Sequence, residues 1–486
     1  MTMNRIGHPA LECKLASAEE AAALIRPGMT LGVSGFTLSG YPKLVPQALA
    51  RRGEAGEKLR LTVISGASVG DELDGAMTRA GIIARRYPYQ SNRDLRDAIN
   101  AGEVAYVDIH LSQLPLWVRS GVFGAIDYAI VEASSIDGDG IVPTTSVGST
   151  NALVQCAKHV IVELNTLQSE SLRGLHDVYT PELAPNTEPI PIRSVRDHIG
   201  TPYIPCTPDK IAAIVLSDVP DQPAKMPVPD AVTQRIAKNL VTFLQGEIRS
   251  GRLPERLPPL QSGVGGIGNA ILLALAESSL SGLELYSEVL QDGVLDMLDR
   301  GVVDYASGSA LSLTAAYQKR FAENLERYRG KMVLRPQEIS NSPEVIRRLG
   351  VIAVNTAIEI DLSGNVNSTH IDGDRMMNGI GGSGDYARNA GVTIFVTPAT
   401  ARNGALSCVV PCVAHIDHTE HDVDVVITEY GTVDLRGLTA YERAEKLTEC
   451  CAAPEYRDIL RDYMRRVRSE RRFYHGIPFL APEGGI

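Results

Sequence analysis

The 486-residue sequence predicts an α/β protein made of two consecutive units of layered, mostly parallel sheet. Two observations support this: short apolar runs alternate with glycine turns and helical segments, and a proline-rich stretch divides the pattern in two. The strands predicted before the break are Met29–Gly35, Leu59–Ser65, Tyr106–Leu111, Asp127–Glu132, His159–Leu164 and Ile211–Leu216. Those predicted after it are Glu284–Ser287, Val333–Leu334, Val351–Ile360, Val392–Thr397 and Asp424–Glu429.

Proline placement sets the predicted domain boundary. Pro220, Pro223, Pro227 and Pro229 crowd together directly after a predicted strand. Because proline interrupts both helices and strand ladders, we expect a connecting segment here. The predicted domains are therefore residues 1–219 and 230–486, each an α/β unit.

Helices are predicted from their end signals and their periodicity. Ser17-Ala18-Glu19-Glu20 matches a capping box, which typically begins a helix. An amphipathic helix is predicted over Val232–Ile248, and a charged helical segment over Ala440–Arg471.

Composition narrows the class of partners. The hydrophobic fraction is 44% and the charged fraction 22%, which allows a large buried core. The formal net charge is −11 and no basic run occurs, so neither nucleic acid nor an anionic membrane is an expected partner. Aromatic residues make up only 5%, which argues against stacking on single-stranded nucleic acid.

Compartment is inferred from the N-terminus and the cysteines. The first residues contain no long apolar run typical of a secretory signal, and no segment approaches the roughly 20 apolar residues of a spanning helix. The seven cysteines are scattered and form neither a disulfide framework nor a CxxC site. We therefore expect a protein of the reducing cytoplasm.

A glycine loop followed by a carboxylate at a strand end is the stretch that most indicates chemistry. The loop is Gly263-Val264-Gly265-Gly266-Ile267-Gly268, and Glu288 ends the next predicted strand. A glutamate can attack an acyl group while free backbone N–H groups hold the oxyanion, so we interpret Glu288 as the nucleophile.

Other interpretations of this stretch stay open. The loop also fits the dinucleotide pattern G-x-G-x-x-G, with Glu288 roughly 20 residues on. That pattern requires a strand before the loop, and we expect none, because Pro258 and Pro259 precede it. The loop could also be purely structural, and an isolated glutamate after a strand is commonly a surface residue.

Further candidate residues lie later in the chain. The segment Asn378–Asp385 is a second glycine-dense loop, whose backbone N–H groups could join those of the first around one oxyanion. The cluster His415–Asp422 contains three histidines and three carboxylates, but its spacing matches no strong zinc signature, and it could equally be a polar loop. Glu429 ends a predicted strand and could reach the site or be a solvated acid. Spacing alone thus indicates an α/β enzyme for an anionic, acyl-bearing ligand.

Several long strings in a fixed order extend over nearly the whole chain. They are Ser34–Thr37, Gly40–Lys43, Ser65–Ser68, Pro259–Gly265, Tyr286–Val289, Glu338–Asn341, Gly364–Thr369, Asn378–Asp385 and Asp434–Leu438. Through them the chain resembles the acetyl-CoA hydrolase/transferase family of class I CoA-transferases, especially the succinyl-CoA:acetate and propionyl-CoA:succinate enzymes.

The resemblance implies a fold and a set of roles. It implies tandem CoA-transferase (NagB/RpiA-like) α/β domains, a homodimer, and an active site between the domains. It implies that Glu288 forms a glutamyl-CoA thioester and that the N–H groups of Val264 and Gly382 form the oxyanion hole. The implied CoA and substrate contacts are Gly263, Val264, Gly265, Gly266, Ile267, Gly382 and Arg402, with Asn341, Ser68 and Glu429 as supporting polar residues.

Two positions depart from the family pattern. Relatives usually carry asparagine where this chain has Gly266, and they often carry lysine at the position of Arg402. Arginine could still pair with a CoA phosphate, although with a different geometry.

The expected activity is ping-pong transfer of CoA between a short-chain acyl-CoA (succinyl-, propionyl- or acetyl-CoA) and a carboxylate. CoA is then a substrate, and no metal or other cofactor is expected. The alternatives are an acyl-CoA hydrolase that uses the same glutamate, a nicotinamide dehydrogenase, and a non-catalytic CoA-binding protein. The sequence does not identify the acyl pair.

Overall fold

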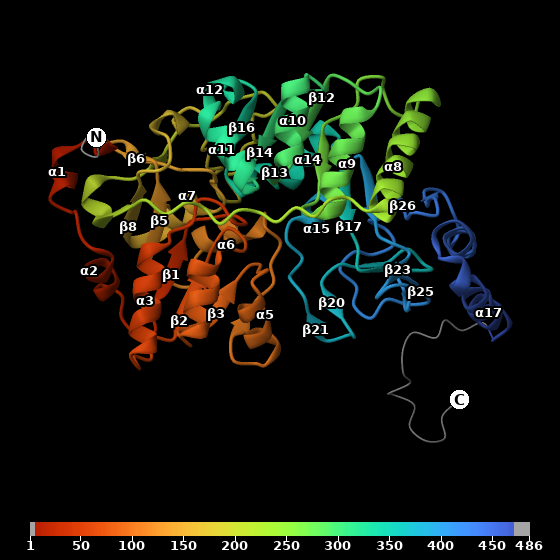
Figure 1. The fold of residues 1–486 in the computed structure, drawn as a ribbon, viewed down its shortest axis with the longest axis horizontal. Helices are drawn as coiled ribbons and strands as arrows, with labels where there is room; N and C mark the ends of the chain where they lie inside the picture. The colour runs from red at the N-terminus through yellow and green to blue at the C-terminus, as the bar shows by residue number, and fades with distance from the viewer. Residues whose placement is uncertain (1–4, 471–486) are drawn as a thin grey trace.

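Two large sheets form the frame of the protein (Figure 1). The computed structural model describes residues 5–470. The first sheet has seven strands in the order β10-β8-β5-β1-β2-β3-β4, all parallel. Its strands are β1 Thr30–Val33, β2 Leu61–Ile64, β3 Ile83–Tyr87, β4 Ala105–Tyr106, β5 Ile126–Ala133, β8 Ala157–Asn165 and β10 Ile211–Ser217.

The second sheet has eight strands in the order β16-β14-β12-β11-β17-β22-β26-β27, and only the edge strand β27 is antiparallel. Its strands are β11 Leu260–Ser262, β12 Leu283–Tyr286, β14 Val303–Gly308, β16 Met332–Leu334, β17 Ile352–Thr356, β22 Val392–Val396, β26 Val425–Ile427 and β27 Thr432–Asp434. The α/β class and the mostly parallel sheets predicted from the sequence are confirmed.

The two sheets share one topology. In the first, β1, β2 and β3 run outward on one side, and β5, β8 and β10 run outward on the other. In the second sheet, β11, β12 and β14 follow one another outward toward one edge, and β17, β22 and β26 follow one another outward toward the other edge. This is the doubly wound order. In it, ligands bind beyond the carboxyl ends of the strands, at the point where the order in which the chain adds strands changes from one edge of the sheet to the other.

Helices accompany the sheets in both halves of the chain. In the first half these are α1 Pro9–Glu12, α2 Ala18–Ala23, α3 Leu44–Glu54, α4 Ala76–Arg79, α5 Arg93–Asn100, α6 Gln113–Arg119 and α7 Thr150–Cys156. In the second half they are α8 Ala231–Arg249, α9 Gly266–Glu277, α10 Asp292–Arg300, α11 Ala315–Glu323, α12 Leu325–Tyr328, α13 Gln337–Ser340, α14 Pro343–Leu349, α15 Ser383–Ala387, α16 Ala440–Lys446 and α17 Pro454–Glu470. Arg471, the predicted end of the last helix, lies outside the described residues.

In the described part of the chain, five small sheets of two or three short strands lie outside the two large sheets. They are β6 Ser135–Ile136 with β7 Gly140–Val142 and β9 Ile204–Pro205, β13 Val289–Gln291 with β15 Ala310–Ser312, β18 Glu359–Asp361 with β19 Val366–Asn367 and β25 Val409–Val410, β20 His370–Ile371 with β21 Arg375–Met376, and β23 Thr400–Ala401 with β24 Leu406–Ser407.

Local sequence explains the well-predicted elements. The interior strands β5 and β8 have apolar middles, Ala129–Val131 and Val160–Val162, as expected for a parallel sheet that is covered on both faces. The capping box at Ser17 is present, with the Ser17 hydroxyl accepting from the backbone of Glu20. Helix α8 begins where Asp230 accepts a hydrogen bond of 2.8 Å from the N–H of Thr233.

The two halves are packed against each other rather than separate. One cluster of buried apolar side chains contains residues of both sheets, such as Ile126 and Ile352. The segment after β8 crosses to the second sheet, where the N–H of Asp177 donates to the carbonyl of Leu334 at 2.9 Å. A buried ion pair between Asp177 and Arg335 reinforces this crossing.

Several details of the strand prediction were wrong. The single strand expected over Val351–Ile360 is two strands, β17 and β18, which belong to different sheets. A strand, β11, does lead into the first glycine loop, because the ladder begins immediately after Pro259 and needs only Leu260–Ser262. The strand expected over Tyr106–Leu111 is limited to β4, since the N–H of Leu111 instead donates to the carbonyl of Gly381. Strands β3 and β14 were not predicted.

No helix within residues 5–470 combines the length and apolarity needed to cross a bilayer.

Candidate active site

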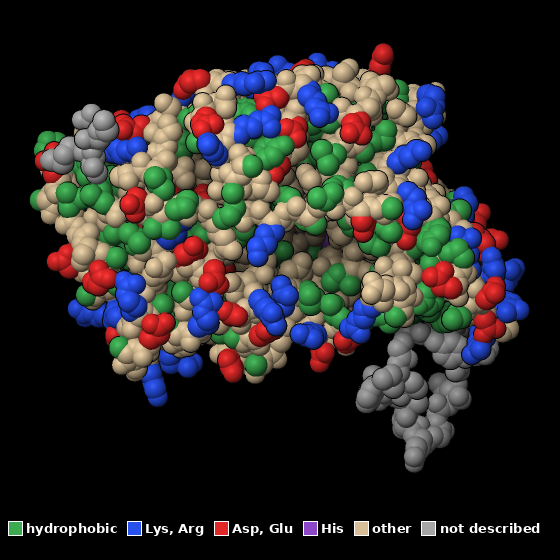
Figure 2. Space-filling model, in the orientation of Figure 1, with side chains coloured by type: hydrophobic (Ala, Val, Ile, Leu, Met, Phe, Trp, Pro, Cys, Tyr) green, Lys and Arg blue, Asp and Glu red, His purple; other side chains and the backbone are tan. Residues whose placement is uncertain are grey.

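A cleft of about 610 Å³ lies where the carboxyl ends of both sheets meet. The loops after β1 and β2 contribute Thr37 and Ser68, and those after β11 and β12 contribute Val264 and Glu288. Figure 2 shows the molecule hollowed near the centre of this face. The duplicated topology thus points both switch regions toward a single cavity.

Glu288 occupies the short turn between β12 and β13, on the floor of the cleft. Its backbone carbonyl accepts the N–H groups of Ser309 and Ala310, at 2.6 and 3.1 Å. Its carboxylate oxygen Oε1 accepts a short hydrogen bond from Nδ2 of Asn341, which is fully buried. Backbone and side chain of Glu288 are therefore both fixed.

The environment of Glu288 disfavours its charged form. The side chain is partly exposed to the cleft while protein encloses its other sides, and this desolvation raises its pKa to about 7. The hydrogen bond from Asn341 lowers the pKa, and the nearby charge of Asp385 raises it. At neutral pH a substantial fraction of Glu288 is ionised yet poorly solvated, which suits a nucleophile.

Two residues that line the cleft, Val264 and Gly382, have backbone N–H groups without an acceptor among the described residues. Among the described residues, the N–H groups of Val264 and Gly382 make no hydrogen bond, although the next N–H of the first loop, that of Gly265, donates to Gln291 at 3.1 Å. Gly382 lies directly against the nucleophile candidate: a Cβ at this position would be 1.4 Å from Oε1 of Glu288. A side chain at this position would displace the ends of the Glu288 and Asn341 side chains, and free N–H donors beside a carboxylate can hold an oxyanion.

The second glycine loop is held by the first half of the chain. Both carboxylate oxygens of Asp108 accept the N–H of Ile380, at 3.0 and 2.9 Å. The hydroxyl of Tyr106 donates to the carbonyl of Asn378 at 3.0 Å. Residues from the end of the first sheet therefore set the position of a loop that belongs to the second.

Asp385 anchors the end of the same loop. Its oxygens accept the N–H and the hydroxyl of Ser112, at 3.0 and 2.6 Å, and Nδ2 of Asn341 at 3.3 Å. Burial raises the pKa of Asp385 to about 7, although these hydrogen bonds oppose the rise. The amide of Asn341 thus links the carboxylates of Glu288 and Asp385.

The remaining residues of the first glycine loop divide between the cleft and the helix that follows the loop. Gly263 and Gly265 line the cleft, as does Ser68, whereas Gly266 and Ile267 form the first turn of α9. A Cβ at Gly266 would be 3.0 Å from Cγ of Pro227, so the crossing segment leaves little room for a larger residue. This contact gives a physical reason for glycine at the departing position.

Two predicted contacts lie elsewhere. Arg402 is exposed in the turn between β23 and β24 and is not among the described residues that line the cleft. Glu429 is also outside that lining, and its Oε2 accepts the N–H of Ala399 at 2.8 Å, which caps the turn after β22. Their roles toward CoA stay predictions.

The three histidines of the cluster His415–Asp422 have different surroundings. His415 lies 3.3 Å from Asp417, whose carboxylate accepts the N–H of Ser368 at 2.7 Å. His418 is buried, with Nε2 3.1 Å from the hydroxyl of Ser383 beside the second glycine loop, and His421 is exposed. Among residues 5–470, no three His, Cys, Asp or Glu side chains converge as a metal site.

Comparison with protein families matches both parts of the chain. Residues 5–216 match the acetyl-CoA hydrolase/transferase N-terminal domain, and residues 318–464 match the acetyl-CoA hydrolase/transferase C-terminal domain. The chain belongs to the acetyl-CoA hydrolase/transferase family. The resemblance noted in the sequence is confirmed.

Curated members of this family are similar over nearly the whole chain. The succinyl-CoA:acetate CoA-transferase of Clostridium kluyveri is 46% identical over 95% of this chain and 86% of its own length. The propanoyl-CoA:succinate CoA transferase of Escherichia coli is 42% identical, with 92% of each chain covered. An acetyl-CoA hydrolase of Yarrowia lipolytica is 40% identical over 94% of this chain and 90% of its own.

Two solved structures share the fold of this chain. RipA from Yersinia pestis has a TM-score of 0.73 at 21% identity, covering 95% of this chain and 98% of its own. The 4-hydroxybutyrate CoA-transferase of Porphyromonas gingivalis has a TM-score of 0.65 at 23% identity, covering 94% and 98%.

Some residues that hold the loops around the cleft were not singled out from the sequence. Asp108 lies in the stretch Tyr106–Leu111 that was interpreted as strand, Ser112 directly follows that stretch, and Asp385 was noted only as the end of a glycine loop. Their partners are more than 270 residues away in the chain, so no local pattern announces them. An acid directly after a parallel strand was the one available signal.

Proposed function

We propose that this family member is an acyl-CoA:carboxylate CoA-transferase that uses Glu288 as its nucleophile. The observation that carries the proposal is the packing of the Glu288 carboxylate against Gly382, between two glycine loops with unpaired N–H groups. Such a site presents a poorly solvated carboxylate and oxyanion donors in one cleft.

The first half-reaction loads CoA onto the protein. The Glu288 carboxylate attacks the acyl-CoA carbonyl, and the N–H groups of Val264 and Gly382 stabilise the tetrahedral oxyanion. The CoA thiolate leaves, which gives a mixed anhydride of the acyl group and Glu288. The thiolate then attacks the carbonyl on the Glu288 side, releases the first carboxylate and leaves a glutamyl-CoA thioester.

The second half-reaction reverses these steps with another carboxylate. This acceptor attacks the glutamyl thioester, the thiolate leaves, and it then attacks the acyl side of the new anhydride. The products are a new acyl-CoA and free Glu288 carboxylate. Because every step keeps one activated acyl group, the proposed mechanism needs no metal, ATP or other cofactor. Succinyl-, propionyl- and acetyl-CoA are the proposed donors, and a homodimer is the proposed assembly.

The test is the fate of each acyl-CoA, separated by chromatography, with and without an acceptor carboxylate. Transfer predicts a new acyl-CoA that appears only with acceptor, and its absence from a folded Glu288→Ala variant. Persistent transfer in that variant would remove Glu288 from the role.

Hydrolysis of acyl-CoA is the second candidate, and acetyl-CoA hydrolases among the similar proteins favour it. Water would then resolve the glutamyl thioester in place of a carboxylate. Free CoA accumulating at the same rate without acceptor would establish hydrolysis.

A further inference from the structure

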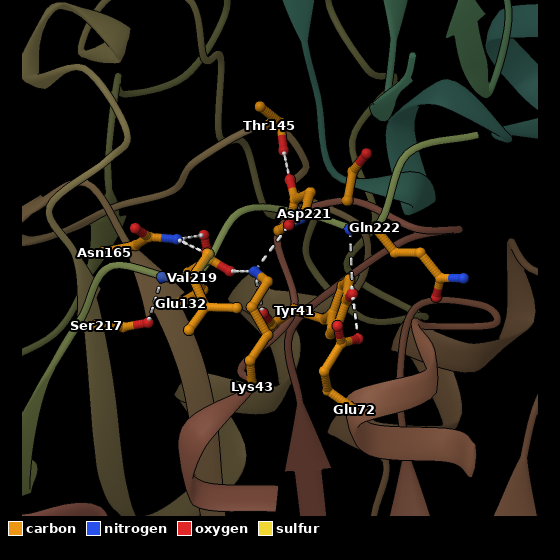
Figure 3. Close-up of polar contacts among 12 residues, drawn as sticks. Tyr41, Lys43, Glu72, Glu132, Thr145, Asn165, Ser217, Val219, Asp221 and Gln222 are labelled. Carbon is orange, nitrogen blue, oxygen red and sulfur yellow. Dashed lines mark hydrogen bonds and ion pairs between the residues drawn. The ribbon is translucent and has the colours of Figure 1, made fainter. Parts of the chain in front are cut away.

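The segment 219–227, here called the strap, connects the two halves and passes over the cleft (yellow-green in Figure 1). Its first anchor is the carboxylate of Asp221, which is buried in the first half. This carboxylate accepts the hydroxyl of Thr145 at 2.6 Å and Nζ of Lys43 at 2.8 Å (Figure 3). It also accepts the N–H of Gly40 at 3.2 Å.

Lys43 makes this anchor rigid. It is fully buried and pairs with Glu132 as well as with Asp221 (Figure 3). Burial alone would lower the pKa of Lys43, but the two carboxylates outweigh it and raise the pKa, so the ammonium stays charged. Asn165 completes the network by donating to Glu132 at 3.0 Å and to the strap carbonyl of Val219 at 2.8 Å.

The strap is then pinned to the second half. The N–H of Ala224 donates to the carbonyl of Leu313 at 2.9 Å, and the ring of Pro227 lies against Gly266 at the start of α9. Between these contacts the strap exposes Lys225 and Met226 to the cleft. The side chain of Lys225 is thus offered to the cavity from a backbone fixed on both sides.

Lys225 supplies the positive charge among the described residues that line the cleft. Among the described residues that line the cavity it is the one lysine or arginine, and Glu288 is the one acid. It is exposed and makes no ion pair or hydrogen bond with another described residue. In a protein of net charge −11, an anionic substrate entering beside Glu288 needs a local cation, and Arg402 is not in the lining.

We propose that Lys225 binds an anionic oxygen group of the thioester substrate. The group is either a phosphate of CoA or the far carboxylate of a dicarboxylic acyl group, and an ammonium suits both as a point charge. This proposal rests on the proposed function, since it assumes that acyl-CoA occupies the cleft.

The experiment compares Lys225→Gln and Lys225→Arg with Lys238→Gln, which alters an exposed lysine on α8 outside the cleft. KM and kcat are measured with acetyl-CoA, succinyl-CoA and acetyl-pantetheine, which lacks the CoA phosphates. We expect Lys225→Gln to raise KM roughly three- to tenfold for at least one CoA thioester with kcat retained, as loss of a partly exposed ion pair allows. Lys225→Arg should keep most of the affinity.

The substrates separate the two sources of negative charge. A KM rise shared by acetyl-CoA and succinyl-CoA but absent for acetyl-pantetheine assigns the phosphate, and a rise confined to succinyl-CoA assigns the far carboxylate. Equal KM values for Lys225→Gln, Lys238→Gln and the unmodified protein on all three substrates would overturn the proposal. So would a rise of the same size for acetyl-pantetheine.

Failure of the proposed function is recognised separately. If the unmodified protein consumes no thioester, calorimetric titration with CoA alone replaces kinetics. CoA binding that Lys225→Gln weakens and added salt also weakens would keep the cation site without the transferase. Unchanged binding of CoA in Lys225→Gln would exclude the phosphate contact, and unchanged binding of succinyl-CoA as well would overturn the site.

Discussion

Neutralising Glu288 should make the protein more stable while ending its chemistry. Enclosure by protein raises the pKa of Glu288 from 4.5 to about 7, so the folded state holds this proton more tightly than the unfolded chain does. At about 1.4 kcal/mol for each tenfold in proton affinity, the ionised side chain costs the fold about 3 kcal/mol at high pH. Glu288→Gln keeps the size of the side chain and the acceptor for Asn341 but removes that cost.

The sign of the pH dependence follows from the direction of the pKa shift. Below about pH 4.5 Glu288 is protonated in both states and contributes no penalty; between about 4.5 and 7 the penalty grows, and above about 7 it is constant. The stability advantage of Glu288→Gln should therefore be absent at low pH and reach about 3 kcal/mol near pH 8.

Denaturant unfolding of both proteins from pH 4.5 to 8 tests this, with Glu54→Gln, an exposed acid at the end of α3, as the matched control. The same ionisation should appear in activity as kcat/KM that rises through about pH 7. A pH-independent stability difference between Glu288→Gln and the unmodified protein would refute the reasoning.

Three further changes have defined outcomes. Gly382→Ala should lower kcat/KM by roughly 10²–10³, because its Cβ would overlap Oε1 of Glu288 and displace the loop N–H; near-normal kinetics would exclude this donor. Asp385→Asn should move the rise of kcat/KM to lower pH by a fraction of a pH unit, since the charge of Asp385 raises the pKa of Glu288; an unmoved profile would show that the two do not interact. Gly246→Ala changes a residue of α8 where the added Cβ would lie 3.9 Å from its nearest neighbour, Nη2 of Arg249. Because alanine favours a helix more than glycine does, the unfolding free energy should rise by about 0.5–1 kcal/mol at unchanged kcat, and a lower unfolding free energy would contradict this.

The fold was predictable where a local run of apolar residues indicates a buried strand. Strands β5 and β8 each contain a short apolar, largely β-branched core, Ala129–Val131 and Val160–Val162, which was sufficient to predict them. Strand β3 was missed because it contains Arg85 and Arg86, which resemble an exposed surface. Arg86 is in fact fully buried against Asp74, and a pairing partner in another element leaves no local signal.

The candidate site was predictable in part for the same reason. Glu288, Val264 and Gly382 belong to short local patterns, and the structure brings all three to one cleft. The residues that hold these parts in place were not predictable. Asp108 and Lys225 have ordinary neighbours in sequence, and their positions at the cleft follow only from how the two halves meet.

The duplicated fold explains why the site depends on both halves. In each sheet the strands stay parallel, but the order in which the chain adds them reverses beside the central strand, β1 or β11, and the carboxyl ends of both sheets border one cleft. The second half carries the nucleophile candidate and both glycine loops, but Asp108 of the first half fixes the N–H of Ile380, two residues before Gly382. An oxyanion donor is effective only if its direction is set before reaction, because reorienting it would consume the stabilisation it gives. The first half therefore contributes to the proposed chemistry chiefly by holding a loop of the second in one orientation.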